Sequence, residues 1–368
     1  MTTKRPFVRR EGQAYDEYVS GSGTRTTHQM SLSALGESLS DEERATLLEA
    51  VGQGHSGAAH ALRSESSPEH LEALLTGLQE NIGAPGSLIP YLADPRVAPA
   101  LISSARAFAL GTGSNHYQVV AMIGGAEARS ALRERMGLLS ADERCWVDDP
   151  FFNALAGELA VVSGGLLKLA ADELEAADCL ARLAAHPCEF NRSTALRDAA
   201  DAFDFGLRTK AMLRLRGVFE ALDLNASEAE FTAALPVVMV LRPEAATTRC
   251  RALLFDQKRK DRRFFPASLV TLPLHTAALS LLVEWIPTEP DPRVVLGPAI
   301  MLRSAFTAAF IEDLFRRALM SESPSLRRDA IKLLPLLPSA DQRTLAVEAL
   351  HDEPDPALRR DLAALAAT

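Results

Sequence analysis

The sequence predicts an all-α protein built as a solenoid of stacked helical hairpins. Three observations carry this prediction: a short phrase that occurs three times, a proline-led phrase that recurs every 32 residues, and a scarcity of strand signals. The apolar run at 235–241 is the most strand-like segment. Seven apolar residues do not by themselves separate a strand from a buried helix segment, but Ser227 is an expected N-cap and strand signals are scarce, so we assign the whole chain to helices.

The repeated phrase reads SLSDEER at 38–44, LLSADER at 138–144 and LLPSADQR at 336–343. Each copy places a serine three residues before a glutamate or glutamine. This is the spacing of a capping box, in which each side chain binds the backbone amide of the other residue. The pairs are Ser40 with Glu43, Ser140 with Glu143 and Ser339 with Gln342. We therefore expect a helix to begin at each serine.

The proline-led phrase sets a period near the C-terminus. Pro292, Pro324 and Pro356 each precede an apolar helical pattern, and proline suits the first position of a helix because its φ is already fixed. Between Pro324 and Pro356 lies a second amphipathic helix. Two short helices in each period cannot bury their apolar faces alone, so the pattern is typical of repeats that stack on one another.

Residues 290–368 resemble HEAT repeats of the short bacterial kind, also called PBS-lyase-type repeats. The inner helix of this family opens with Asp-Pro-x-Val-Arg, which Asp355, Pro356, Leu358 and Arg359 match. Pro324, Leu326 and Arg327 match it too, with Ser323 in the aspartate position. The resemblance implies a right-handed superhelical α-solenoid. It also implies that Arg327 and Arg359 are structural, and that they bond to a turn carbonyl or to Asp355.

We expect four regions along the chain. Residues 1–30 are rich in glycine, serine and threonine and suggest a mobile N-terminal arm, followed by N-terminal helical repeats at 31–139. Residues 140–285 are either irregular repeats or an inserted helical domain, with long helices that include the stretch 193–222. Residues 286–368 form the regular C-terminal repeats.

The charge is unevenly distributed along a chain whose formal net charge is −9. Residues 151–205 hold nine acidic against four basic residues, whereas residues 249–263 hold seven basic against two acidic ones. The basic stretch centres on Lys258, Arg259, Lys260, Arg262 and Arg263. We interpret it as a solvated loop or as a contact for a protein partner with an acidic surface. The net negative charge argues against a nucleic-acid partner.

The composition is that of a globular protein, and no apolar run reaches the roughly 18 residues that a membrane span requires. We expect no contact with a membrane. The N-terminus lacks the apolar region of a secretory signal, and four cysteines in 368 residues do not form a disulfide framework. The sequence therefore predicts a cytoplasmic protein with reduced thiols.

No residue set predicts a catalytic, cofactor or metal site. Cys179, His186, Cys188 and Cys250 lack the ligand spacing of a structural zinc site, and buried cysteines explain them better. The carboxylates of Asp142, Glu143, Asp148 and Asp149 gather around Trp146, in what we interpret as a helix–helix turn. Gly164 and Gly165 lack the spacing of a phosphate loop, and we expect them at a helix contact.

These observations favour a non-enzymatic scaffold or adaptor that binds another protein on the concave surface of a solenoid. Two alternatives remain at this point. One is a DNA-binding protein or enzyme resembling the HEAT-like alkylpurine DNA glycosylases, with Trp146, Trp285 and Asp148 as site residues. The other is a chromophore lyase or chaperone, as the name of the repeat suggests.

Overall fold

The structure is a computed structural model. It describes residues 17–20, 23–26, 41–53, 58–59, 62, 67–79, 85–147, 153–225, 227–256, 269 and 276–367. The described residues are helical except for turns and one antiparallel hairpin, in which β1 (Glu17–Ser20) pairs with β2 (Gly23–Thr26). The all-α class is therefore confirmed. The hairpin falls within residues 1–30, where the sequence predicted no regular element.

The chain divides into two compact units, Met1–Leu222 and Asp223–Thr368. Unit 1 contains the hairpin and the first eleven described helical elements. They are α2 (Asp41–Gly52), α4 (Pro68–Gln79), η1 (Pro85–Tyr91), α5 (Val97–Ala107), α6 (Ser114–Ile123), α7 (Gly125–Ala141), η2 (Glu143–Trp146), α8 (Ala154–Leu169), α9 (Leu174–Leu183), α10 (Glu189–Ala202) and α11 (Lys210–Ala221).

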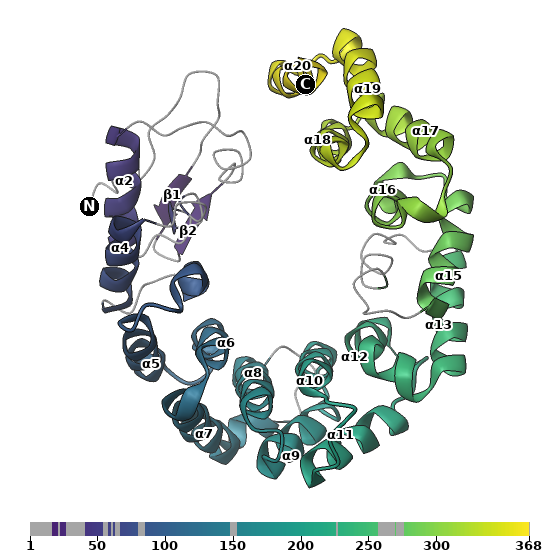
Figure 1. The fold of residues 1–368 in the computed structure, drawn as a ribbon. Helices are drawn as coiled ribbons and strands as arrows, with labels where there is room; N and C mark the ends of the chain where they lie inside the picture. The colour runs from purple at the N-terminus through teal and green to yellow at the C-terminus, as the bar shows by residue number, and fades with distance from the viewer. Residues whose placement is uncertain are drawn as a thin grey trace. The chain divides into compact units, whose positions relative to one another are not determined.

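Most of unit 1 consists of two layers of helices (Figure 1). Helices α6, α8 and α10 lie side by side in one layer, and α5, α7, α9 and α11 form the other. Helices α5 to α9 each pack on the next helix in the sequence, and contacts within a layer join α6 to α8, α8 to α10, α5 to α7 and α9 to α11. For example, α8 contacts α6 and α10 within its layer and α7 and α9 in the other layer.

Two adjacent glycines bring α8 close to both neighbours in its layer. A Cβ atom on Gly165 would lie 2.8 Å from the Cβ of Ala121 in α6. A Cβ atom on Gly164 would lie 2.7 Å from the Cβ of Asp198 in α10. Both distances are shorter than real Cβ contacts, so the interpretation of Gly164 and Gly165 as residues of a helix contact is confirmed.

Unit 2 shows the same kind of packing. Its elements are α12 (Glu228–Leu241), α13 (Pro243–Phe255), α15 (Thr276–Trp285), η3 (Ile286–Thr288), α16 (Pro292–Met301), η4 (Arg303–Ala305), α17 (Ala308–Leu319), α18 (Pro324–Leu333), η5 (Leu334–Leu336), α19 (Ser339–Asp352) and α20 (Pro356–Ala367). Helices α16, α18 and α20 contact one another in sequence order and form one layer. Helices α17 and α19 pack against each other in a second layer (Figure 1).

The helices near the C-terminus begin where the sequence predicted. Helices α16, α18 and α20 begin at the three repeated prolines, and α19 begins at Ser339. Ser227 caps α12 by accepting a hydrogen bond from the backbone amide of Glu230, and the run 235–241 is helical. These predictions are confirmed.

The capping-box prediction is wrong at two of its three positions, and Ser40 lies outside the described residues. Ser140 lies inside α7, because the apolar stripe of that helix continues to the buried Leu139. Asp142 is the capping residue there and accepts from the amide of Arg144. Ser339 already occupies the first helical position of α19, so Pro338 stands at the N-cap and no side chain caps the helix.

The long helix expected over 193–222 is also interrupted. Helix α10 ends at Ala202 and α11 begins at Lys210. The Asp204 side chain accepts a hydrogen bond from the Gly206 amide, which forms a turn, and the Thr209 hydroxyl caps α11 by accepting from the Met212 amide. Local side-chain bonds of this kind compete with helix continuation.

Candidate functional site

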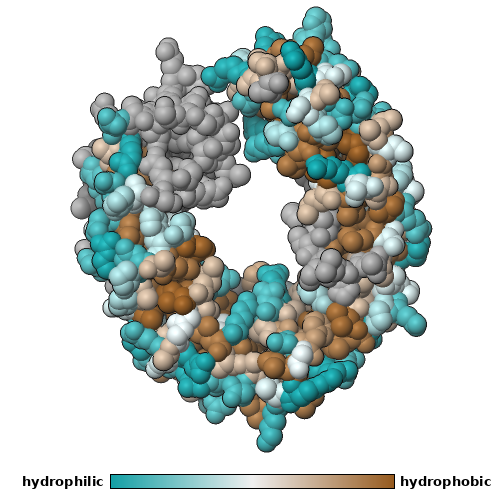
Figure 2. All heavy atoms as spheres, viewed as in Figure 1, coloured by the Kyte–Doolittle hydropathy of each residue, from teal (hydrophilic) through white to brown (hydrophobic). Residues whose placement is uncertain are grey.

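A cleft of about 750 Å³ opens in unit 2 where two turns meet, one between α17 and α18 and the other between α19 and α20. Its apolar lining comes from Leu319, Met320, Pro324, Leu345, Ala349 and Pro354. Its charged lining comes from Arg316, Glu322, Arg327, Glu348, Asp352 and Glu353, with His351 beside them. Figure 2 shows apolar surface over the helices of this unit, bordered by polar residues.

The apolar lining combines buried and exposed side chains. Leu319 and Leu345 are buried, with exposed fractions of 6% and 1%. Met320, in the turn that follows α17, is 75% exposed, the highest fraction among the large apolar side chains that the structure describes. Methionine is flexible and polarizable, and it is common on surfaces that bind other proteins. The cleft therefore has an apolar base and an apolar side chain at its edge.

A buried ion pair fixes the shape of the cleft. Arg327 in α18 donates to both carboxylate oxygens of Glu353, at 2.8 Å from Nε to Oε2 and 3.1 Å from Nη2 to Oε1. Its Nη1 donates to the carbonyl of Ser321 at 2.8 Å, and Glu353 also accepts from the amide of Asp355 at 2.9 Å. Because these bonds join both turns, the walls of the cleft are held in place before any partner binds.

Two of the charges at the cleft remain uncompensated. Arg316 pairs with Glu348 at 2.9 Å, and Arg327 is held by Glu353. Among the described residues, Glu322 forms no ion pair and is exposed. Asp352 lies 3.9 Å from the exposed imidazole of His351, which is charged only when protonated. The lining thus has four carboxylates against two arginines, and the surplus is negative.

Arg327, Asp355 and Arg359, which the resemblance marks as structural residues, all lie near this cleft. Arg359 donates from Nε to the carbonyl of Glu353 at 3.0 Å. Arg327 and Arg359 both donate to a turn carbonyl, which is one of the two partners that the resemblance implied, whereas the carboxylate that binds Arg327 is Glu353 and not Asp355. The Asp355 carboxylate accepts from the amide of Ala357 at the start of α20, so it is engaged in capping the helix.

The position of these arginines follows a rule that sequence reasoning missed. Arg327 and Arg359 each occupy the fourth position of a helix and donate to the carbonyl six residues earlier. Arg192, the fourth residue of α10 in unit 1, does the same with the carbonyl of His186. An arginine at the fourth helical position, after a turn, is the signal that could have identified Arg192.

A second buried ion pair lies in unit 1. Arg135 in α7 donates to Glu158 in α8 at 2.6 Å and to the carbonyls of Phe108 and Ala109 at 2.9 and 2.7 Å. Glu158 also accepts from the amide of Gly113, and the guanidinium lies 5.2 Å from the ring centroid of Tyr117. All of these side chains are buried, and the pair joins α7 and α8 to the turn between α5 and α6.

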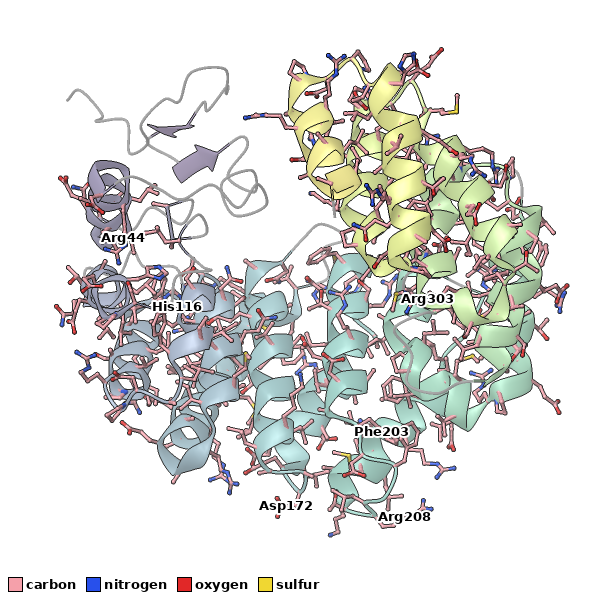
Figure 3. The ribbon with its side chains drawn as sticks, turned by 45° about the horizontal axis from the view of Figure 1, so that its top comes forward. Arg44, His116, Asp172, Phe203, Arg208 and Arg303 are labelled. Carbon is pink, nitrogen blue, oxygen red and sulfur yellow. The ribbon has the colours of Figure 1, made fainter. Side chains whose placement is uncertain are left out.

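Two titratable groups elsewhere in unit 1 are destabilising when charged, because desolvation shifts their pKa values towards the neutral form. His116 in α6 (labelled in Figure 3) is buried against Phe108, and burial lowers its pKa to about 4. In α10, burial raises the pKa of the Asp198 carboxyl to about 6, and its Oδ2 atom has no hydrogen-bond partner.

Two turns of unit 2 are also joined at the end of α18 that lies away from the cleft. Arg303 (labelled in Figure 3) follows α16 and donates to the carbonyl of Leu336 in η5. Met301, at the end of α16, is 63% exposed and does not line the cleft. It provides an exposed methionine to compare with Met320.

The five residues of the predicted basic loop, Lys258, Arg259, Lys260, Arg262 and Arg263, lie outside the described residues. The structure therefore does not place this loop.

The cysteine and histidine residues form no metal site in the described part of the chain, where no group of three or more His, Cys, Asp or Glu side chains has the required arrangement. Cys145, Cys188 and Cys250 are buried free thiols, and His186 accepts a hydrogen bond from the amide of Cys188. Burial raises the pKa of Cys145 and of Cys250 to about 12, which keeps both thiols protonated.

The residues considered for a DNA glycosylase are engaged in packing or lie outside the described residues. Trp285 is 2% exposed in the core of unit 2. Trp146 in unit 1 lies under the guanidinium of Arg182, which is 3.6 Å from the ring centroid, and donates to the carbonyl of Ser140. Asp148 and Asp149 lie outside the described residues. Trp285 is therefore buried, and one face of the Trp146 ring is covered by Arg182.

Comparisons with known proteins identify no family. No family model and no curated protein matches the chain. One solved structure that is similar is a crystal structure of an engineered protein from the Northeast Structural Genomics Consortium. It is 13% identical, and the match covers 92% of this chain and 97% of that one with a TM-score of 0.34. A similarity this low carries no argument about fold or function. In the part of the chain that the structure describes, no helix has the length and apolarity needed to cross a bilayer.

Proposed function

We propose that the protein is a non-enzymatic scaffold or adaptor that works in the cytoplasm and binds another protein. The observation that carries this proposal is the cleft in unit 2, where an apolar base, an exposed methionine and a fixed polar frame occur together. Interfaces between proteins combine an apolar centre with a polar rim, and a few well-packed residues in the centre supply most of the affinity.

We further propose that the helices of each unit are HEAT-like hairpins stacked as a right-handed α-solenoid. The layered packing supports this, because most helices contact both a neighbour in the sequence and another helix of their own layer. The arginine at the fourth helical position, bonded to the preceding turn, supports a repeated unit as well. Stacked repeats of this kind form long surfaces that hold other proteins.

The fixed frame of the cleft favours binding to a partner over an internal structural role. A preformed site loses little conformational entropy when a partner binds. Arg327 and Glu353 provide that rigidity, because each makes bonds to the backbone of a turn in addition to their own ion pair. Met320 remains exposed although it lies next to the buried Leu319.

The proposal is tested by capturing partners with the tagged full-length protein from its native cells. The wild type is compared with Met320→Ser, and Met301→Ser serves as the matched control because both methionines are exposed in unit 2. Each captured protein is then purified and titrated against all three forms by calorimetry.

We expect at least one protein that binds the wild type and Met301→Ser saturably and binds Met320→Ser more weakly. Recovery of nucleic acid alone, or of proteins that show no saturable binding once purified, would contradict the proposed function.

A further inference from the structure

We infer that the cleft between α17, α18 and α19 binds a basic segment of the partner protein, with an apolar side chain flanked by lysine or arginine. This inference rests on the proposed function and specifies the partner's chemistry at that site. It is distinct from the basic stretch 258–263, which the sequence predicts to be either a solvated loop or a contact for a partner with an acidic surface.

The apolar part of the inference follows from the cleft's base. Leu319 and Leu345 are buried, and Ala349 and Pro354 add no polar side-chain group. A cleft of about 750 Å³ is large enough for an aliphatic or aromatic side chain. Inserting such a side chain would also cover Met320, which is 75% exposed. Removing this apolar surface from water favours binding.

The basic part follows from the charges that the cleft leaves uncompensated. Both arginines of the lining are already paired, Arg316 with Glu348 and Arg327 with Glu353. Glu322 and Asp352 are exposed and have no arginine or lysine partner among the described residues. Lysine or arginine residues beside the inserted side chain would reach these carboxylates and provide the electrostatic complementarity found in specific interfaces.

An acidic segment or a phosphate backbone does not fit the same cleft. Either would need Arg327 as its counter-charge, but withdrawing Arg327 from Glu353 would leave a buried carboxylate without its partner. Breaking a buried ion pair in this way is strongly unfavourable. Arg316 is half-exposed, but Glu348 already engages it at the wall of the cleft. The structure thus favours a cationic partner.

A displayed library of random short peptides tests the inference on the full-length chain. Peptides enriched on the wild type are synthesised, and their affinity is measured by fluorescence anisotropy for four forms of the protein. These are the wild type, Met320→Ser, the matched control Met301→Ser, and the double charge variant Glu322→Lys/Asp352→Lys.

We expect the enriched peptides to share an apolar residue flanked by lysine or arginine. Their Kd should increase by about tenfold or more in Met320→Ser, as expected for the loss of a central interface contact, and stay unchanged in Met301→Ser. The charge variant should weaken the same peptides. It should also strengthen binding of versions in which the basic residues are replaced by glutamate, and both effects should diminish as salt rises.

Enriched peptides that are acidic, or that bind all four forms equally, overturn the inference. In the second case the peptides bind elsewhere on the chain, so the proposed scaffold function stands while its assignment to this cleft fails. If no peptide is enriched, the inference fails as well, and the capture experiment then decides the proposed function on its own.

Discussion

The two buried arginine–glutamate pairs, one in each unit, have similar chemistry but different surroundings. Arg135 and Glu158 in unit 1 have side chains that are 5% and 0% exposed, and the ring of Tyr117 lies beside the guanidinium. Arg327 and Glu353 in unit 2 have side chains that are 9% and 2% exposed, and both line an open cleft. In each pair the arginine also donates to turn carbonyls and the glutamate accepts from a turn amide.

The difference in surroundings shows how a buried arginine–glutamate pair can also support a binding site. In unit 1 the pair is enclosed, so its bonds serve only to hold α7, α8 and the turn before α6 together. In unit 2 the same set of bonds joins two turns at the edge of a cleft. The pair in unit 2 therefore contributes both to stability and to the shape of the surface that we propose as the binding site.

The largest expected effect is a loss of stability when the arginine of a buried pair is removed, and this loss should differ between the two pairs. Arg135→Ala should lower the free energy of unfolding of unit 1 by about 3–5 kcal/mol, because it leaves Glu158 as a buried charge without its partner. Arg327→Ala should have a smaller effect on unit 2, because removal of the arginine side chain opens the buried Glu353 to water in the adjacent cleft. Chemical denaturation, with transitions assigned to each unit by hydrogen exchange, measures both values.

Arg251→Ala is the control for these two variants, because Arg251 forms an exposed pair with Glu284 at 2.7 Å. Its effect should stay below about 1 kcal/mol. An Arg327→Ala effect larger than that of Arg135→Ala would contradict the comparison.

The next prediction concerns packing in unit 1. Gly164→Ala should destabilise the protein by about 1–3 kcal/mol, because the added Cβ would meet the Cβ of Asp198 at 2.7 Å and its carbonyl oxygen at 3.1 Å. Gly137→Ala in α7 is the matched control, since no atom lies within 4 Å of its new Cβ. Alanine should stabilise the helix there by about 0.5–1 kcal/mol. Thermal unfolding that ranks the two variants in the opposite order would refute the close contact between α8 and α10.

Asp198 gives unit 1 a pH dependence that Asp198→Asn should remove. The folded protein holds the carboxyl's proton up to a pKa of about 6, whereas the unfolded chain releases it near 3.8. The folded state therefore binds more protons between these values, and its stability falls as the pH rises from about 4 to 6. Above pH 6 the Asn variant should be more stable than the wild type by up to about 3 kcal/mol, which is the free-energy equivalent of the difference between the two pKa values.

Denaturation of both proteins across this pH range measures the difference. His116 acts in the opposite direction, because its lowered pKa of about 4 reduces stability as the pH falls below 6.5. Since both proteins contain His116, its contribution cancels in the comparison. Equal stability of the two proteins at pH 7 would show that the carboxyl is not destabilising.

The smallest expected effect is that of Arg359→Ala. Arg359 donates to the carbonyl of Glu353 and is exposed, so its loss should cost about 1 kcal/mol. The melting temperature of this variant, compared with that of Arg360→Ala in the same helix, measures the effect. A loss as large as that of Arg327→Ala would mean that the carbonyl bond, and not the buried ion pair, dominates the stability of these turns.

The fold was predictable where the chain's signals are local. Proline at the first helical position and apolar residues at helical spacing located the starts of α16, α18 and α20. Ser339 is not the N-cap because α19 begins at that residue, after Pro338, and the capping box at Ser140 failed because a three-residue spacing does not show whether the preceding helix has ended. That depends on tertiary packing, here on the burial of Leu139.

The cleft was harder to predict because its parts are far apart in the sequence. Arg327 was identified by resemblance, but Glu353, its partner, lies 26 residues later and was assigned no role. Met320 gave no signal either, since a methionine after a helix is common and only its exposure sets it apart. The cleft is formed by contacts between successive turns of the folded chain, and a sequence pattern does not show which turns come into contact.

Hydrogen exchange of the full-length protein, with and without a peptide selected on it, tests the central claim most directly. We predict that bound peptide slows exchange in residues 316–327 and 345–354, around the cleft of unit 2. Exchange in residues 108–113, which bond to the enclosed pair of unit 1, should stay unchanged, and Met320→Ser should abolish the effect. Protection that appears in unit 1, or that persists in Met320→Ser, would contradict the account.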